Sequence, residues 1–443
     1  MRLAVVLVCH DAYLPLLSEA VGAIDGQGVP FDQKILITDS CDAPDWLVGW
    51  ETIRLDAANP NPCRNLGLDT VVADWVVFWD ADNVMHRDYA SHVRWKAKRV
   101  DDGVAVLFPN LHYFGGIEKM VSPPDWSEDS VSITNCWDTS SAWRKSALDQ
   151  CRWDDESLCH DDWGLALKLM REGWRGERLN THVNMRHHNV GGSERRSIEG
   201  WENVDNRRAE MLWKIRSMGV CTVFSREENM DRYFKQLETL DLPPLRSLYI
   251  LNNTGSDECH KRLLAHTAAL EGWQSITLIK QGAPVPANRE IDKEHHLRLK
   301  NISVLTNLLW RRVTEDILFS IDDDCFAVEP DAAKKLHYHL RTKESAVSGA
   351  GYKSKKARNS LVATYGLNSY GAPIKDDFDK VALVGSVGAG FTMYLRAKLK
   401  YAFPVRPFDK NANFAGHDFN ICYLLRQKGE TVTLDATVKV DHV

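Results

Sequence analysis

The sequence has no apolar run long enough to cross a membrane. The longest runs, such as residues 3–9 and 75–79, have the length of a strand, whereas a membrane-spanning helix needs roughly 20 apolar residues. The N-terminus leads almost directly into the first of these runs, without the charged region and cleavage site of a secretion signal. We therefore expect a protein without transmembrane segments that is located in the cytoplasm.

The chain also lacks paired cysteines and an excess of positive charge. Its ten cysteines contain no CxxC pair and have no regular spacing, so the pattern indicates neither a zinc site nor a disulfide framework. We expect most of them to be buried, reduced thiols. The formal net charge of -6 and the pI of about 6.3 provide no basic field that would attract nucleic acid over long range.

What the chain has is enough apolar material for two domains. Its 443 residues, 44% of them hydrophobic, exceed what one core usually holds. Residues 3–9, 34–38 and 75–79 read as buried strands, with helical patterns at 14–24 and 64–72 between them. This βαβαβ order predicts an α/β domain with a parallel sheet.

The same pattern begins again late in the chain. Residues 247–251, 274–279 and 316–321 are further strand candidates, and the charged, amphipathic segment 201–240 before them is read as mostly helical. The dipeptide at 243–244, two prolines, marks the entry to the second half. We predict an α/β fold of two tandem domains, at 1–200 and 244–443, joined by a mostly helical linker at 201–243.

Each half carries an acidic cluster directly after a buried strand. Asp80 and Asp82 follow the strand at 75–79, and Asp322, Asp323 and Asp324 follow the strand at 316–321. Carboxylates at such a strand end can converge on one divalent cation, and ligands bind at the carboxyl ends of strands in open α/β sheets. A single cluster would more often be a solvated turn, but its repetition favours a metal site.

A second acidic signal lies downstream in each half. Asp161 and Asp162 open a helical pattern that stops at Gly173, and Asp418 opens one that stops at Gly429. An aspartate in a first turn can simply cap its helix. Because the acid recurs after both acidic clusters, we interpret it as catalytic.

Histidines end a short strand in each half and are candidate further metal ligands. They are His187, His188 and His442.

On these motifs, the first half resembles the inverting glycosyltransferases of family 2, which have the nucleotide-binding fold called GT-A. The resemblance covers residues 3–188 and includes the segment Cys63-Arg64-Asn65-Leu66-Gly67. It implies that Asp162 acts as general base toward the acceptor hydroxyl, with Asp161 as the alternative. It also implies that four residues contact the donor nucleotide, namely Asp39, Arg64, Asn65 and Asp80, and that Asp80 and Asp82 hold the metal.

The second half, residues 245–442, resembles the exostosin-like glycosyltransferases of family 64, which have the same fold and retain the donor's stereochemistry. The matching stretches include Leu318–Asp324 and the glycine-rich Gly388-Ala-Gly-Phe391. The resemblance implies that Asp418 lies near the anomeric carbon. At Leu308 and His417 the sequence departs from the family pattern. The resemblance assigns donor contacts to Asn252, Asn253, Asn307, Asp322 and Asp323. The predicted metal ligands of this half are Asp322 and Asp324, with the repeated closing histidine, His442, as the candidate third.

The resemblance therefore predicts a bifunctional hexosyl- or N-acetylhexosaminyltransferase that uses Mn²⁺ or Mg²⁺ and a nucleotide sugar, foremost a UDP-sugar, on a glycan acceptor such as a surface polysaccharide. Among the 15 tryptophans, Trp137 and Trp163 are candidate sugar-stacking platforms. One alternative is glycosylation of a modified DNA base, with the basic stripe 94–99 as a local contact. The other is one active domain with a degenerate partner that binds glycan or is structural.

Overall fold

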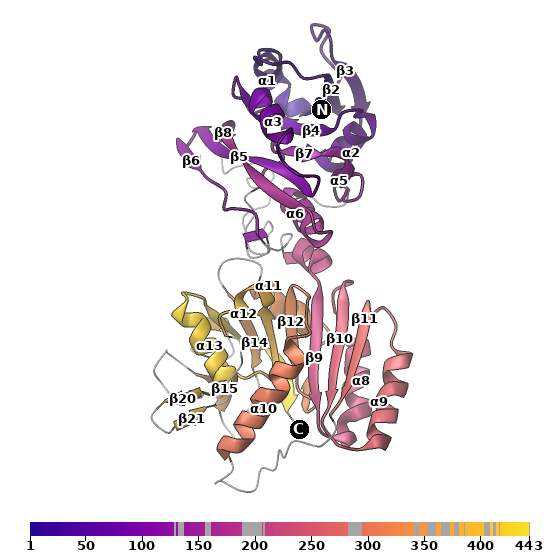
Figure 1. Ribbon diagram of the computed structural model, residues 1–443, viewed down its shortest axis with the longest axis vertical. Coiled ribbons are helices and arrows are strands. Elements are labelled where there is room, and N and C mark those ends of the chain that lie inside the picture. The colour runs from indigo at the N-terminus through magenta and orange to yellow at the C-terminus, as the bar shows by residue number, and fades with distance from the viewer. Residues whose placement is uncertain are drawn as a thin grey trace. The chain divides into compact units, whose positions relative to one another are not determined.

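The computed structural model describes residues 1–127, 130–131, 137–155, 161–187, 206, 209–281, 295–340, 345–351, 360–364, 373–375, 381–384, 386–402, 408–410, 413–415 and 417–442. The chain divides into two compact units, Met1–Met211 and Leu212–Val443 (Figure 1). Each unit is built on one large mixed sheet with helices. The predicted class, two α/β domains in tandem, is confirmed. In the described part of the chain, no helix has the length and apolar character needed to span a membrane.

The first domain alternates strands and helices along most of its length. Its strands are β1 (Leu3–His10), β2 (Gln33–Asp39), β3 (Glu51–Leu55), β4 (Trp75–Asp80), β5 (Val104–Gly115), β6 (Lys119–Val121), β7 (Ala142–Arg144) and β8 (Arg175–His187). Its helices are η1 (Asp11–Tyr13), α1 (Leu14–Asp25), α2 (Pro60–Thr70), α3 (Tyr89–Ala97), α5 (Lys145–Leu148) and α6 (Asp161–Arg171).

The sheet of the first domain has the order β3-β2-β1-β4-β7-β5-β6, with β8 beside β5. The first four strands in this order are parallel, whereas β7 runs antiparallel to both β4 and β5. Strand β1 is buried on both faces, as expected for the centre of a parallel sheet covered by helices. This arrangement brings the carboxyl ends of β1, β2 and β4 to one edge.

The second domain has the same kind of alternation. Its strands are β9 (Met218–Phe224), β10 (Arg246–Asn252), β11 (Ser275–Lys280), β12 (Ile317–Ile321), β13 (Cys325–Ala327), β14 (Val347–Gly351), β15 (Ser360–Thr364), β16 (Pro373–Lys375), β17 (Val381–Leu383), β18 (Ser386–Val387), β19 (Phe391–Leu395), β20 (Phe408–Lys410), β21 (Asn413–Ala415) and β22 (Val432–His442). Its helices are η2 (Glu227–Asn229), α8 (Met230–Thr239), α9 (Asp257–Ala269), α10 (His295–Trp310), α11 (Ala332–His339), α12 (Arg396–Leu399) and α13 (His417–Gln427).

The large sheet of the second domain repeats the topology of the first. Its order is β11-β10-β9-β12-β19-β14-β22-β13, in which β9, β10, β11 and β12 are parallel. Strand β19 runs antiparallel to β12 and β14, as β7 does to β4 and β5. Strand β22 pairs in parallel with β14, as β8 does with β5. The two domains thus share one strand order, with β9 in the place of β1.

Strand β9 lies inside the segment expected to be a helical linker, and here the structure differs from the sequence-based expectation. Residues 209–215 and α8 are helical, but residues 218–224 between them form a strand hydrogen-bonded on both sides. This strand is almost entirely buried. The short apolar run was overlooked because amphipathic helices flank it on both sides. The second domain therefore begins before β9, and Arg246–Asn252 is its second strand.

The predicted helix ends at Gly173 and Gly429 are confirmed. Helices α6 and α13 stop two residues before these glycines, and both glycines have φ +81°. The amide of the residue after each glycine donates to a carbonyl in the last turn, at Leu169 and Leu425 respectively. Such a left-handed end favours glycine because it lacks a Cβ.

Candidate active sites

The first candidate site lies at the carboxyl ends of β2 and β4. Asp39, the last residue of β2, is buried, and its Oδ1 accepts hydrogen bonds from the amides of Ala57 (2.9 Å) and Ala58 (3.0 Å) and from the Ser40 hydroxyl (3.1 Å). Ser40 and Ala58 have φ +63° and +51°, a conformation that is uncommon outside glycine. Asp39 thus stabilises two unusual backbone turns at this edge.

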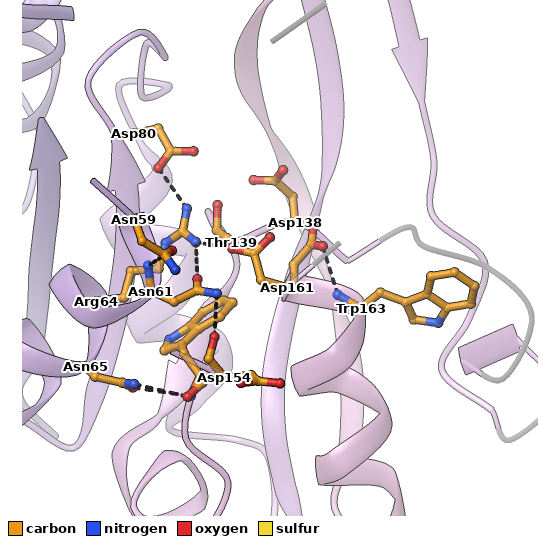
Figure 2. A network of polar contacts seen from close by, with 12 residues as sticks. Asn59, Asn61, Arg64, Asn65, Asp80, Asp138, Thr139, Asp154, Asp161 and Trp163 are labelled. Atoms are coloured by element: carbon orange, nitrogen blue, oxygen red, sulfur yellow. Dashed lines mark hydrogen bonds and ion pairs between the residues drawn. The ribbon is translucent and has the colours of Figure 1, made fainter. Parts of the chain in front are cut away.

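Arg64, on α2, joins the two acidic motifs of this domain (Figure 2). Its Nη1 donates to Asp161 Oδ2 at 2.5 Å, and its Nη2 donates to Asp80 Oδ1 at 3.2 Å. Its guanidinium carbon also lies 5.0 Å from the centre of the Trp153 ring. Three residues assigned to the site from sequence, Arg64, Asp80 and Asp161, therefore meet in the folded chain.

The guanidinium of Arg64 is a fixed positive charge. Its side chain is only 5% exposed, and this burial opposes the charged form, but Asp80 and Asp161 raise the pKa of Arg64 above its ordinary value. The contact with Asp80 leaves that carboxylate partly accessible, since the Asp80 side chain is 38% exposed. An incoming ligand can therefore reach Asp80 while Arg64 stays charged.

Asn65 contacts the loop before α6. Its Nδ2 donates to Asp155 Oδ1 at 2.6 Å and to the Trp153 carbonyl at 3.0 Å. Asn59 and Asn61 also bind this loop, through the carbonyls of residues 155 and 154 (Figure 2). The sequence analysis missed these two residues, although the repeated Asn-Pro of residues 59–62 was a visible signal. Asn65, expected to contact the donor, here holds the loop that leads to Asp161.

Asp162 lies in the first turn of α6, and its Oδ1 accepts a hydrogen bond from the amide of Trp163 at 2.8 Å. Burial, and then the nearby charges of Asp161 and Asp138, raise the pKa of Asp162 to about 8. A carboxyl group tuned toward neutral pH has the property that a general base requires. Trp163 and Trp137 are fully buried, so they belong to the core and do not provide the exposed ring faces expected for sugar stacking.

The end of β8 lies against the acidic turn of this site. The Arg186 amide donates to Asn83 Oδ1 at 3.0 Å, and its Nε donates to the Asp82 carbonyl at 3.1 Å. Among the side chains that the structure describes, however, Asp80 and Asp82 belong to no closely spaced set of three ligands, and the side chain of His187 is not among those described. His188 lies outside the described residues. The two carboxylates are oxygen donors of the kind that Mg²⁺ and Mn²⁺ prefer.

The second candidate site lies at the carboxyl end of β12. Asp323 Oδ2 accepts hydrogen bonds from the amides of Ser225 (2.6 Å) and Arg226 (2.7 Å), and its carbonyl accepts one from Asn229 Nδ2 (2.9 Å). The guanidinium of Arg226 pairs with Asp323 and, at 3.0 Å, with Asp324 Oδ2. Both carboxylates are 2% exposed. In contrast to the acids of the first site, these two carboxylates are covered by protein contacts, whereas Asp322 is exposed.

Arg226 was missed because β9, the strand that precedes it, had been assigned to the linker. A buried strand followed by a basic residue was the available signal, since the loop after such a strand faces the same edge as the acids. Asp322, the first acid of the turn, is exposed, unlike its two neighbours. Its amide donates to the Gly390 carbonyl at 2.7 Å, which places the glycine-rich loop beside the acids.

The asparagines predicted to contact the donor fall into two groups. Asn252 ends β10 and Asn253 follows it at the same edge, where the Asn253 amide donates to the Phe224 carbonyl at 2.8 Å. Asn252 Oδ1 accepts from the amide (3.0 Å) and hydroxyl (2.7 Å) of Thr254. Asn307 Nδ2 instead donates along its own helix, α10, to the Ser303 carbonyl at 2.8 Å.

Asp418 repeats the geometry of Asp162. It lies in the first turn of α13, and its Oδ1 accepts a hydrogen bond from the amide of Phe419 at 2.9 Å. The two aspartates that open these helices therefore correspond in three dimensions as well as in sequence.

The closing histidine of the second domain reaches its acidic turn. His442 Nε2 lies 3.3 Å from Asp324 Oδ2, while Cys325 Sγ lies 3.9 Å from Asp324 Oδ1. Ligand atoms of these three residues all lie within 4.8 Å of one another. The predicted set was Asp322, Asp324 and His442. The structure brings two of these together and adds Cys325, which the sequence analysis had taken for an ordinary buried thiol.

Comparison with solved structures finds similar chains at low identity. Staphylococcus aureus TarS 1–349 in complex with UDP-GlcNAc is 12% identical, with 77% of this chain and 87% of that chain covered and a TM-score of 0.39. The same TarS region in complex with UDP is 14% identical, with 48% and 66% covered and a TM-score of 0.36. The mannosyltransferase PcManGT from Pyrobaculum calidifontis, in complex with GDP-Man and Mn²⁺, is 18% identical, with 48% and 61% covered and a TM-score of 0.34.

The last two matches thus span less than two thirds of the matched chains. No protein-family model matches the chain, and no curated protein matches it. All three TM-scores are below 0.5.

Proposed function

We propose that the chain is a bifunctional glycosyltransferase with two GT-A domains, each of which transfers a sugar from a nucleotide-sugar donor. The observation that carries the proposal is the repetition of one arrangement in both domains. In each, acids follow the fourth strand of the parallel order, and an aspartate opens the helix before the last long strand. Capping explains one such aspartate, but it does not explain why both acidic features recur together.

In the first domain, we assign donor binding to the edge formed by Asp39, Arg64 and Asp80. The charged Arg64 would face the diphosphate, which gains negative charge as it leaves. Asp162 would take the proton of the acceptor hydroxyl, because its raised pKa makes it a stronger base than an ordinary carboxylate. Direct attack by the activated hydroxyl inverts the anomeric centre.

In the second domain, we assign donor contacts to Asn252, Asn253 and Asp322, and the position beside the anomeric carbon to Asp418. The family 64 resemblance predicts that the product of this domain retains the donor's configuration. The donors are proposed to be UDP-sugars, and the acceptor a glycan.

A divalent cation held by Asp80 and Asp82 would neutralise charge on the leaving diphosphate. Both side chains offer oxygen ligands of the kind that Mg²⁺ and Mn²⁺ prefer. We expect removal of metal with EDTA to abolish transfer by the first domain, and added Mn²⁺ or Mg²⁺ to restore it. Full activity in the chelated enzyme would contradict this assignment.

The alternative of DNA glycosylation draws little support from the basic stripe. Arg94 pairs with Asp32 at 2.8 Å, and Lys96 pairs with Glu177 at 2.5 Å, so these charges are already partly neutralised within the protein. The alternative of a degenerate second domain is favoured by one observation, namely the burial of Asp323 and Asp324 against Arg226. The experiment must therefore distinguish a degenerate second domain from an active one.

The test is a screen of nucleotide sugars for hydrolysis and transfer by the full chain and by two double variants. Asp80→Asn with Asp82→Asn should remove one transfer and spare the other, and Asp322→Asn with Asp324→Asn should do the reverse. Anomeric coupling constants measured by NMR should show inversion for the first domain's product and retention for the second's.

Controls for this screen are the exposed acids Asp45 and Glu271, whose replacement by Asn and Gln should leave both transfers unchanged. If no nucleotide sugar is turned over by the wild-type chain, the glycosyltransferase proposal fails. If the second double variant matches wild type in every product, the second domain is a binding or structural module.

A further inference from the structure

The pairing of β13 with β22 places a cysteine and a histidine side by side. Cys325 and His442 are direct partners in this antiparallel pair. Residues directly opposite one another in such a pair project their side chains on the same face of the sheet, about 4.5–5.5 Å apart. Their juxtaposition is therefore set by the backbone ladder and does not depend on a loop.

Asp324 completes this cluster from the position just before β13. Its Oδ1 faces Cys325 Sγ at 3.9 Å, and its Oδ2 faces His442 Nε2 at 3.3 Å. The carboxylate thus lies between the thiol and the imidazole. Cys325 and Asp324 are buried, and the His442 side chain is 18% exposed, so the cluster retains access to solvent on the histidine side.

Acidic side chains lie close to the cluster. Asp322, Asp323 and Asp324 form consecutive acids, and Arg226 is the cation seen to pair with Asp323 and Asp324. Asp323 is committed to Arg226 and to the amides of residues 225 and 226. Arg226 thus contributes one positive charge beside three consecutive carboxylates.

We propose that Asp324, Cys325 and His442 form a site for a Zn²⁺-class metal ion. One thiolate, one imidazole and one carboxylate suit Zn²⁺ or Co²⁺, whereas Mg²⁺ and Ca²⁺ prefer oxygen ligands alone. Three protein ligands leave one position of a tetrahedral ion for water or another ligand. The thiol proton of Cys325 passes to solvent as the metal binds. Cys325 is the residue that separates this site from an ordinary pair of acids.

The test is a titration of the metal-free, reduced full chain with Co²⁺, followed by absorption spectroscopy. The wild type should show the visible bands of tetrahedral Co²⁺ together with a near-ultraviolet thiolate-to-cobalt charge-transfer band. Zn²⁺ should displace the signal, and Mg²⁺ should not. In Cys325→Ser the charge-transfer band should be lost, whereas the control Cys259→Ser, another buried cysteine of this domain, should keep it.

A charge-transfer band that is absent from the wild type, or that persists in Cys325→Ser, would overturn the proposal. If Cys325→Ser does not fold, as judged by circular dichroism, His442→Gln supplies the second test, and its Co²⁺ spectrum must lose the tetrahedral bands. The spectra are recorded without nucleotide sugar. Their outcome is therefore independent of whether the chain transfers sugars.

Discussion

The two domains share a strand order and the placement of their acids, but they supply the opposing positive charge differently. In the first, Arg64 reaches the acids from α2 and connects Asp80 with Asp161. In the second, Arg226 reaches them from the loop after β9 and contacts Asp323 and Asp324, two neighbours in one turn. The first arrangement links two segments of the site, whereas the second closes a single turn.

This difference matters because it changes which carboxylates a ligand can reach. Asp80 has a side chain that is 38% exposed and Asp161 one that is 18% exposed, while Asp323 and Asp324 are almost completely buried. The fold alone therefore fixes where the acids are placed. The position of one arginine influences which of these acids a ligand can reach.

The largest expected effect is on turnover in the first domain. Asp162→Asn should lower its rate by about 10²-fold or more, because the general base is lost, while nucleotide-sugar affinity should stay near that of wild type. Asp418→Asn is the matched variant of the second domain and should leave the first domain's product unchanged. Single-turnover rates and donor binding by calorimetry separate the two effects. Near-normal turnover in Asp162→Asn would move the role to Asp161.

The pH dependence of the first domain provides a sharper test of the same residue. A base works in its ionised form, so the rate should rise with pH through about 8, the raised pKa of Asp162. The neutral form is the one favoured by the fold, so the stability that it contributes should be present at low pH and lost as pH rises through about 8. Asp162→Asn should abolish this step in rate and should gain in melting temperature relative to wild type above that pH. A pH-independent rate between about 6 and 9 would exclude Asp162 as the base.

The next largest effect is the loss of folding stability when either arginine is replaced. Arg226→Met leaves two buried carboxylates without their counter-ion and should destabilise the second domain by about 3–5 kcal/mol. Arg64→Met leaves carboxylates that water can reach, so we expect a loss of about 1–3 kcal/mol in the first domain. Urea unfolding monitored by hydrogen exchange resolves the two domains.

Lowering the pH to about 5 should reduce the loss in Arg226→Met, because protonated carboxyl groups need no counter-ion. A larger loss for Arg64→Met than for Arg226→Met would contradict the distinction between an open and a closed site.

The smallest effect tests the equivalence of the two helix ends. Gly173→Ala and Gly429→Ala should each cost about 1 kcal/mol, because both residues have positive φ. No atom lies within 4 Å of the Cβ that either substitution would add, so the cost is conformational and should be equal in the two domains. Gly22→Ala, at an exposed and equally open position within α1, should instead stabilise by up to about 1 kcal/mol. Unequal losses at the two helix ends would show that the ends are not equivalent.

The sequence predicted the elements whose signals are local. Strands such as Leu3–His10 and Trp75–Asp80 were recognised as continuous apolar runs, and the ends of α6 and α13 were recognised from glycine. Strand β9 escaped because its seven residues lie between helices and its burial comes from β10 and β12, which follow it in the chain. One misassigned strand then concealed Arg226 and the true start of the second domain.

The sequence by itself determined that the chain forms two α/β domains with acids at the strand ends, because apolar periodicity and helix-ending glycines act over a few residues. Only the tertiary structure decided which side chains meet. The approach of Arg64 to Asp161, and of Cys325 to His442, joins residues far apart in the chain. Such contacts depend on strand order and register, which are set by the packing of the whole sheet and leave no local signal.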